Sequence, residues 1–150
     1  MDVADNIVDQ LERIGHDLEG EVTFPVLGKN VLFTLGLSGT DIVEQLHKES
    51  IDWLYQNIAN VFPIMEKAIF DYYMSVLPDY HLGLQECADE LMPRLKEPVE
   101  VWKYVTEPGV FIFPEDEGGE IHIEYECTFD IEHGLRVIFK NGVLVKVGLE

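Results

Sequence analysis

The chain has 150 residues, 47% of them hydrophobic, and its 29 acidic against 10 basic side chains give a formal charge of −19. This length is typical of one domain, which can bury a core without disulfides or metals. Such a charge repels nucleic acid and anionic membranes, so both are excluded as partners. We therefore predict a single domain over residues 1–150 that lies in the cytoplasm.

The N-terminal part predicts one short helix and two strands. Residues 3–14 place apolar side chains at helical spacing, and glycines at 15 and 20 end this helix. Residues 21–26 and 30–37 predict strands on either side of a short turn. The acidic start of the chain is unlike a signal peptide, and no apolar run approaches the roughly twenty residues of a membrane span.

The middle of the chain, residues 40–96, is predicted to be rich in helix. Ser38 or Thr40 is a suitable N-cap, and the apolar residues that follow repeat at helical spacing. Pro63 interrupts this pattern, which then resumes, so one kinked helix and two successive helices are both open. Residues 78–83 predict a break, and residues 84–95 predict a further short helix.

The remainder, residues 99–148, is predicted to be an antiparallel meander. Residues 99–105 alternate as a strand does, and Pro108-Gly109 predicts a turn. In residues 120–127 the alternation is strict, with apolar side chains on one face and solvated side chains on the other: Glu120, His122, Glu124 and Glu126. Asn141-Gly142 predicts a type I′ hairpin turn between residues 135–139 and 143–147.

This order of elements predicts an α+β fold. Strands are followed by helices and then by the meander, which favours an antiparallel sheet of about five to seven strands with helices packed on one face. Cys87 and Cys127 form no C-x-x-C pair, so the prediction for both is a small buried hydrophobe.

Motifs for catalysis are incomplete. The chain has no Gly-x-Ser-x-Gly elbow, no phosphate-binding glycine loop and no basic stripe. His122, Glu124 and Glu126 share a strand face, but neighbours two positions apart lie about 7 Å from each other, so a metal would need a second set of ligands. We predict no metal and no cofactor. The alternative is a metal-dependent hydrolase in which His133 is the general base, assisted by His122 and by two nearby carboxylates, Asp130 and Glu132.

Asp130, Glu132, His133 and Gly134 form a compact motif before the last hairpin. A short hairpin connection accounts for Asp130, which can accept from backbone amides, and for Gly134, which tolerates a left-handed conformation. It does not account for Glu132-His133. We predict that the four residues are mainly structural.

The segment Cys127-Thr-Phe-Asp-Ile-Glu-His-Gly-Leu135, together with Lys146-Val-Gly148, resembles the signature of a bacterial domain family of unassigned activity. In that family a strand leads into Trp-Asp-x-Glu-His-Gly-Leu and the last hairpin ends in Val-Gly; here Phe129 replaces the Trp. Residues 68–73 are similar to the middle of the same family. The resemblance implies no catalytic residue, but it implies a candidate role in toxin–immunity loci.

The distribution of charge suggests a partner. Residues 115–133 contain eight acids and no Lys or Arg. We predict that this segment binds a basic protein, such as a cationic toxin that an immunity protein neutralises, through Glu115, Asp116, Glu117, Glu120, Glu124 and Glu126. An apolar anchor is also needed, and Tyr80 or Trp102 is the candidate. The oligomeric state stays open.

Overall fold

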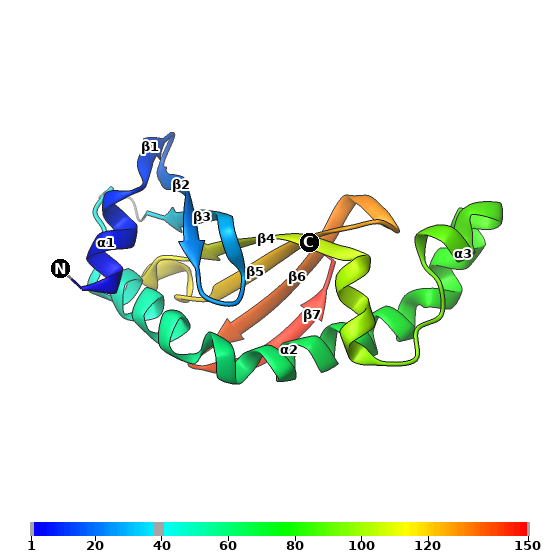
Figure 1. The fold of residues 1–150 in the computed structure, drawn as a ribbon. Coiled ribbons are helices and arrows are strands. Elements are labelled where there is room, and N and C mark those ends of the chain that lie inside the picture. The colour runs from blue at the N-terminus through cyan, green and yellow to red at the C-terminus, as the bar shows by residue number, and fades with distance from the viewer. Residues whose placement is uncertain (1, 38–40, 150) are drawn as a thin grey trace.

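The computed structural model describes residues 2–37 and 41–149 (Figure 1). The helices are α1 (Val3–Asp9), α2 (Gln45–Leu84) and α3 (Ala88–Leu91), with short 3-10 turns η1 (Gln85–Cys87), η2 (Pro98–Lys103) and η3 (Glu115–Glu117). The strands are β1 (Glu12–Ile14), β2 (Asp17–Phe24), β3 (Gly28–Gly36), β4 (Val105–Ile112), β5 (Ile121–Cys127), β6 (Asp130–Lys140) and β7 (Val143–Gly148).

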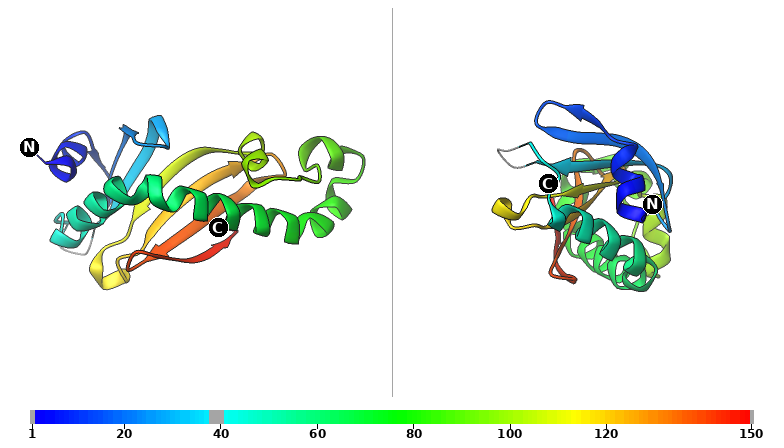
Figure 2. Two further views of the ribbon diagram at one scale, coloured as in Figure 1. Left: turned by 60° about the horizontal axis from the view of Figure 1, so that its bottom comes forward. Right: turned by 90° about the vertical axis from the view of Figure 1, so that its left-hand side faces the viewer.

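All seven strands form one sheet in chain order, and the predicted α+β fold is confirmed. Every neighbouring pair is antiparallel except β3 and β4, which are parallel. A parallel pair needs a long crossover connection, and here the chain from α2 to η2 supplies it. The long helix α2 crosses one face of the sheet (Figure 2).

The core lies between α2 and the sheet. The helix buries hydrophobic residues three, four or seven positions apart, and these are Ile51, Leu54, Ile58, Met65, Ile69, Tyr73 and Leu77. The strands oppose them with alternate side chains; on β5 these are Ile121, Ile123, Tyr125 and Cys127, as predicted. Burial of this apolar surface is the main stabilising contribution to the fold.

α2 continues through Pro63 as one helix, so the alternative of two successive helices is wrong. Pro63 and Pro78 both lie inside α2, and both are on its exposed side, where water can satisfy the carbonyls that proline leaves unpaired. The predicted break at residues 78–83 is therefore wrong. Ser38 and Thr40 lie outside the described residues, and the N-cap of α2 is Glu44.

Four further local predictions differ from the structure. The N-terminal helix ends at Asp9, because residues 12–14 pair with β2 as a strand. Residues 98–103 form η2 instead of a strand: Pro98 begins the turn, and Val101 is fully buried whereas Val99 is exposed. The dipeptide at 108–109 is no turn, since it lies within β4 beside a bulge at which Glu107 has a φ of 57°. Of residues 84–95, only 88–91 are α-helical.

The last hairpin is confirmed. Asn141 and Gly142 have φ values of 51° and 77°, as a type I′ turn requires, and they join β6 to β7. Gly142 also lies under the indole of Trp53, where an added Cβ would be 3.4 Å from Nε1. Both the turn geometry and the packing against Trp53 of α2 therefore favour glycine at position 142.

Candidate functional site

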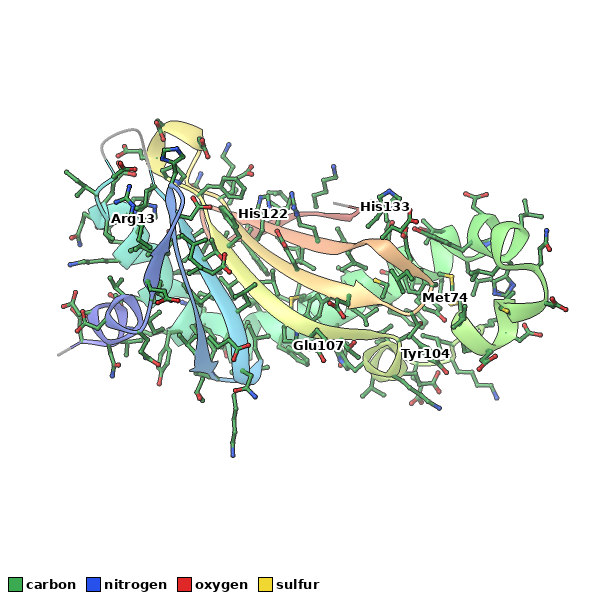
Figure 3. All side chains as sticks on the ribbon, turned by 90° about the horizontal axis from the view of Figure 1, so that it is seen from above. Arg13, Met74, Tyr104, Glu107, His122 and His133 are labelled. Carbon is green, nitrogen blue, oxygen red and sulfur yellow. The ribbon has the colours of Figure 1, made fainter. Side chains whose placement is uncertain are left out.

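The face of the sheet opposite α2 carries a row of aligned residues, three of which are charged. Pairing between neighbouring strands aligns Glu21, Leu32, Gly109, Glu124 and Arg136 across β2 to β6. Aligned residues point to the same side of a sheet. Figure 3 looks onto this open face, with α2 behind the strands.

A shallow groove of about 360 Å³ lies on the open face, and we call it the acidic groove. It has five carboxylates among its lining residues: Glu21, Glu107, Glu124, Glu126 and Glu132. Arg136 binds Glu124 at 3.0 Å. Within the described residues the other four carboxylates form no ion pair, and all four are exposed. Their charges therefore repel one another across the groove.

The acidic groove also exposes apolar surface. Leu32 is 46% exposed and Ile131 is 88% exposed, and both contribute to its lining. Neither predicted anchor lies there: the hydroxyl of Tyr80 binds Asp130, and the indole of Trp102 is stacked on Phe62 with the ring centroids 5.0 Å apart. Leu32 and Ile131 are the apolar groups that a partner in this groove would contact.

The six acids predicted to bind a partner occupy two places. Glu124 and Glu126 line the acidic groove, whereas Glu115, Asp116 and Glu117 form η3 beyond the opposite end of β5 (Figure 1). Glu120 stands beside η3, and six strand positions, about 20 Å, separate it from Glu126. The acids of the predicted segment therefore lie near the two ends of β5 and do not form one cluster.

The groove contains acids that the sequence pattern did not indicate. Glu21 comes from β2, and Glu107 comes from the bulge in β4. Both lie outside residues 115–133. The successive pairing of β2 with β3, β3 with β4 and β4 with β5 brings them beside Glu124.

His122 is buried, although its strand face was predicted to be solvated. Its ring lies 4.5 Å from the ring of Phe113, which in turn lies 4.6 Å from Phe111. Nε2 of His122 is 3.0 Å from Oε1 of Glu120. This histidine is therefore part of a small aromatic cluster on the open face.

Asp130 is the centre of a hydrogen-bond network. Tyr80 donates its hydroxyl to Oδ2 of Asp130 over 2.5 Å, and the backbone amide of His133 donates to Oδ1 over 3.1 Å. Nδ1 of His133 lies 2.9 Å from the same Oδ1. Burial raises the pKa of Asp130, but the hydrogen bonds from Tyr80 and His133 outweigh burial and lower it overall. Burial and the neighbouring Asp130 raise the pKa of Tyr80.

The motif around Asp130 is a strand and not a loop. The turn between β5 and β6 consists of Thr128 and Phe129, and β6 begins at Asp130, with a register shift opposite Tyr125. Gly134 has a φ of 66°, which is the left-handed conformation predicted for it. Phe129 packs edge-on against Tyr73 and Tyr80, with ring centroids 5.3 Å and 5.1 Å away.

The part of the chain that the structure describes has no group of three or more His, Cys, Asp or Glu side chains able to hold a metal ion. None of its helices is both long and apolar enough to cross a membrane. The buried Cys127 fits its prediction, but Cys87 is exposed and does not.

A family model described as a domain of unknown function (DUF6985) matches residues 7–150. No curated protein and no solved structure matches the chain.

Proposed function

The chain belongs to the family of the domain of unknown function DUF6985, and we propose that it is a protein-binding domain whose acidic groove receives a basic protein. The observation that carries this proposal is the combination of five carboxylates with exposed Leu32 and Ile131 in one concave surface. Carboxylates alone would serve solubility equally well.

Electrostatics favours a cationic occupant. Glu21, Glu107, Glu126 and Glu132 are exposed and form no ion pair within the described residues, so their mutual repulsion raises the energy of the free protein. A partner that presents Lys or Arg relieves this repulsion. Complementary charge also accelerates the encounter, to about 10⁸–10⁹ M⁻¹s⁻¹ at low salt.

Affinity requires more than charge. An exposed ion pair contributes only about 0–1 kcal/mol, and most binding energy in protein interfaces comes from a few buried contacts. Ile131 is the most exposed of the large apolar side chains in the described residues, and its burial by a partner would supply one such contact. The expected partner therefore places an apolar side chain among basic ones.

An immunity protein against a cationic bacterial toxin fits these requirements. A nuclease must present positive charge to nucleic acid, so an acidic protein can cover its substrate-binding surface. The resemblance of residues 127–135 to the signature of a bacterial domain family implies the same candidate role. The toxin and its inhibitor would meet in the bacterial cytoplasm.

Among the described residues, no observation favours the alternative, a metal-dependent hydrolase. His133 has its Nδ1 beside Asp130, and His122 is buried among aromatic rings on another part of the sheet. We therefore propose binding, with Asp130, Glu132, His133 and Gly134 as structural residues.

The test measures binding to the purified product of a toxin-like neighbouring gene, at about 50 mM and about 500 mM NaCl. We expect the double substitution Glu126→Lys and Glu132→Lys to slow association roughly tenfold at low salt and to reduce its salt dependence. Ile131→Asp should accelerate dissociation. The control is Asp89→Lys with Glu90→Lys, which makes the same charge change on exposed residues of α3. Equal rates for all four proteins at both salt concentrations would overturn the proposal.

A further inference from the structure

Strands β3 and β4 pair over only part of their length. Their parallel pairing begins at Leu32 and Gly109, although each strand starts four positions earlier, at 28 and at 105. In the part of the chain that the structure describes, residues 28–31 therefore have a strand neighbour in β2 but none in β4. The two strands diverge here, and Glu107 lies on the diverging part of β4 (Figure 3). We call the opening between residues 28–31 and residues 105–108 the fork.

The β3 side of the fork presents the backbone of Asn30. A Cβ placed on Gly109 would lie 3.3 Å from the carbonyl oxygen of Leu32, so the backbone groups of Leu32 point toward β4. Successive residues of a strand direct these groups to alternate sides. Accordingly, the carbonyl oxygen of Lys29 faces β2, where it accepts from Oγ1 of Thr23 over 3.3 Å. The N–H and C=O of the exposed Asn30 therefore point into the fork, where a further strand can pair with them.

The fork has an apolar floor. A hollow of about 200 Å³ lies between its two sides, and most of the lining residues are apolar: Val26, Leu27, Phe62, Trp102, Val105, Thr106, Pro108 and Tyr125. Phe62 belongs to α2 and Trp102 to η2, so the hollow is on the helix side of the sheet. Pro108 and Tyr125 also line the acidic groove on the open side. The fork therefore adjoins apolar surface on one side and carboxylates on the other.

On the premise that the acidic groove receives a basic protein, we propose that this partner enters the fork as an extended segment in which basic and apolar side chains alternate. Successive side chains of a strand point to opposite faces. The basic ones reach the carboxylates of the acidic groove, and the apolar ones reach the hollow. Backbone hydrogen bonds to Asn30 add affinity, as in other cases of strand addition. A helix cannot use Asn30 in this way, because its own backbone groups are paired internally.

Charge selects the occupant of the fork. Glu107 stands in the bulge of β4, and Glu21 and Glu126 contribute further carboxylates from β2 and β5. Lys29 is the one basic residue of β3, and alternation directs its side chain to the face opposite that of Asn30. A second copy of the chain also carries −19 and is repelled. The occupant is therefore a basic segment of another protein.

The test uses a short synthetic peptide, blocked at both ends, that alternates Lys with Val. Its affinity for the full chain is measured by fluorescence anisotropy at about 50 mM NaCl. Asn30→Pro removes the N–H that points into the fork and leaves the N–H groups that face β2 in place. The matched control is Asn30→Ala, which removes only the side chain. We expect Asn30→Pro to bind the peptide at least about tenfold more weakly than Asn30→Ala does.

Two further measurements do not depend on how the variants fold. The same peptide with N-methyl groups on alternate amides keeps its charges and side chains but loses half of its donors, so it should bind the unaltered chain at least about tenfold more weakly. Hydrogen exchange at the amide of Asn30 should slow when the unmodified peptide is bound. Circular dichroism of Asn30→Pro and Asn30→Ala confirms that both variants fold.

The outcomes separate this inference from the proposed function on which it rests. No binding of the Lys–Val peptide, equal affinities of the two folded Asn30 variants, or unchanged exchange at Asn30 in the complex would each overturn the strand pairing. If Glu126→Lys with Glu132→Lys weakens binding in that case, the acidic groove still binds basic protein, but in another form. A peptide with Ser in place of every Lys that bound equally well would instead remove the role of charge, and with it the proposed function.

Discussion

The hydroxyl of Tyr80 donates to the carboxylate of Asp130 over 2.5 Å and so joins α2 to the start of β6, fifty positions further along the chain. Asp130 also accepts from the backbone amide of His133, and its side chain is only 10% exposed. The start of β6 is therefore linked to α2 by a nearly buried carboxylate.

Tyr80→Phe should make the protein more sensitive to acid. The folded-state pKa of Asp130 lies below its ordinary value, so the stability that it contributes is present above the unfolded-state pKa and is lost as the pH falls through the folded-state pKa. Removing the hydroxyl raises that pKa and moves acid unfolding to higher pH. Loss of the hydrogen bond should also cost about 1–2 kcal/mol at neutral pH.

A carboxyl titration monitored by NMR measures the pKa of Asp130. Urea unfolding at several pH values measures the loss of stability. Tyr55→Phe is the control, because Tyr55 is exposed and contacts Phe24 by its ring edge. An unchanged Asp130 titration in Tyr80→Phe would contradict the prediction.

Asp130→Ala should destabilise the protein more than His133→Ala. The Asp130 substitution leaves both the Tyr80 hydroxyl and the His133 amide without their acceptor, for a cost of about 2–3 kcal/mol. His133 has a side chain that is 56% exposed, so its removal should cost only about 0.5–1 kcal/mol. Urea unfolding gives both values. A transition metal bound to His133 in the purified protein would show that the residue is more than structural.

His47→Phe should weaken the start of α2. Nδ1 of this fully buried histidine accepts from the backbone amide of Glu44 over 2.9 Å, and Nε2 donates to the carbonyl oxygen of Gly36 over 2.6 Å. The two partners require the neutral ring with its proton on Nε2. Phenylalanine is a planar but somewhat larger side chain that leaves the buried carbonyl of Gly36 and the partly buried amide of Glu44 unpaired, at a cost of about 2–4 kcal/mol in urea unfolding. Nitrogen chemical shifts that place the proton on Nδ1 would refute the assignment.

Gly134→Ala should be more destabilising than Gly15→Ala. Their φ values are 66° and 63°, so both substitutions force alanine into the left-handed region, at about 1 kcal/mol each. An added Cβ at Gly134 would lie 2.6 Å from the backbone oxygen of Tyr125, whereas at Gly15 no atom lies within 4 Å. We expect a difference of about 1–3 kcal/mol between the two variants in urea unfolding. Equal costs would mean that β6 can shift to relieve the contact.

Only one of the two thiols should react in the native protein. Burial, with a smaller contribution from nearby Asp130, raises the pKa of Cys127 to about 12, and Cys87 is exposed. Thiolate is the reactive form, so at about pH 8 a thiol reagent should label Cys87 alone. Unfolding in urea should release the second thiol. Cys87→Ser should abolish the native reaction, and residual labelling of that variant would indicate that Cys127 becomes accessible by local opening.

The sequence alone determined the features that depend on neighbouring residues. Asn141-Gly142 specifies its hairpin because few other residues tolerate positive φ at both positions. The alternation in β5 identified the buried face correctly, and the apolar spacing of α2 continued through Pro63 because the proline lies on the exposed side. Each of these signals is carried by a short stretch of chain.

Only the tertiary structure decided which segments pair and which side chains meet. The apolar residues at 99–105 fit a strand pattern equally well, but their packing against α2 and the start at Pro98 produced a 3-10 turn. The alternation in residues 120–127 placed His122 on the solvated face, but in the structure Phe113 covers it. The acidic groove combines Glu21, Glu107 and Glu126 from three strands because strand register, which depends on contacts between distant segments, places them on one face.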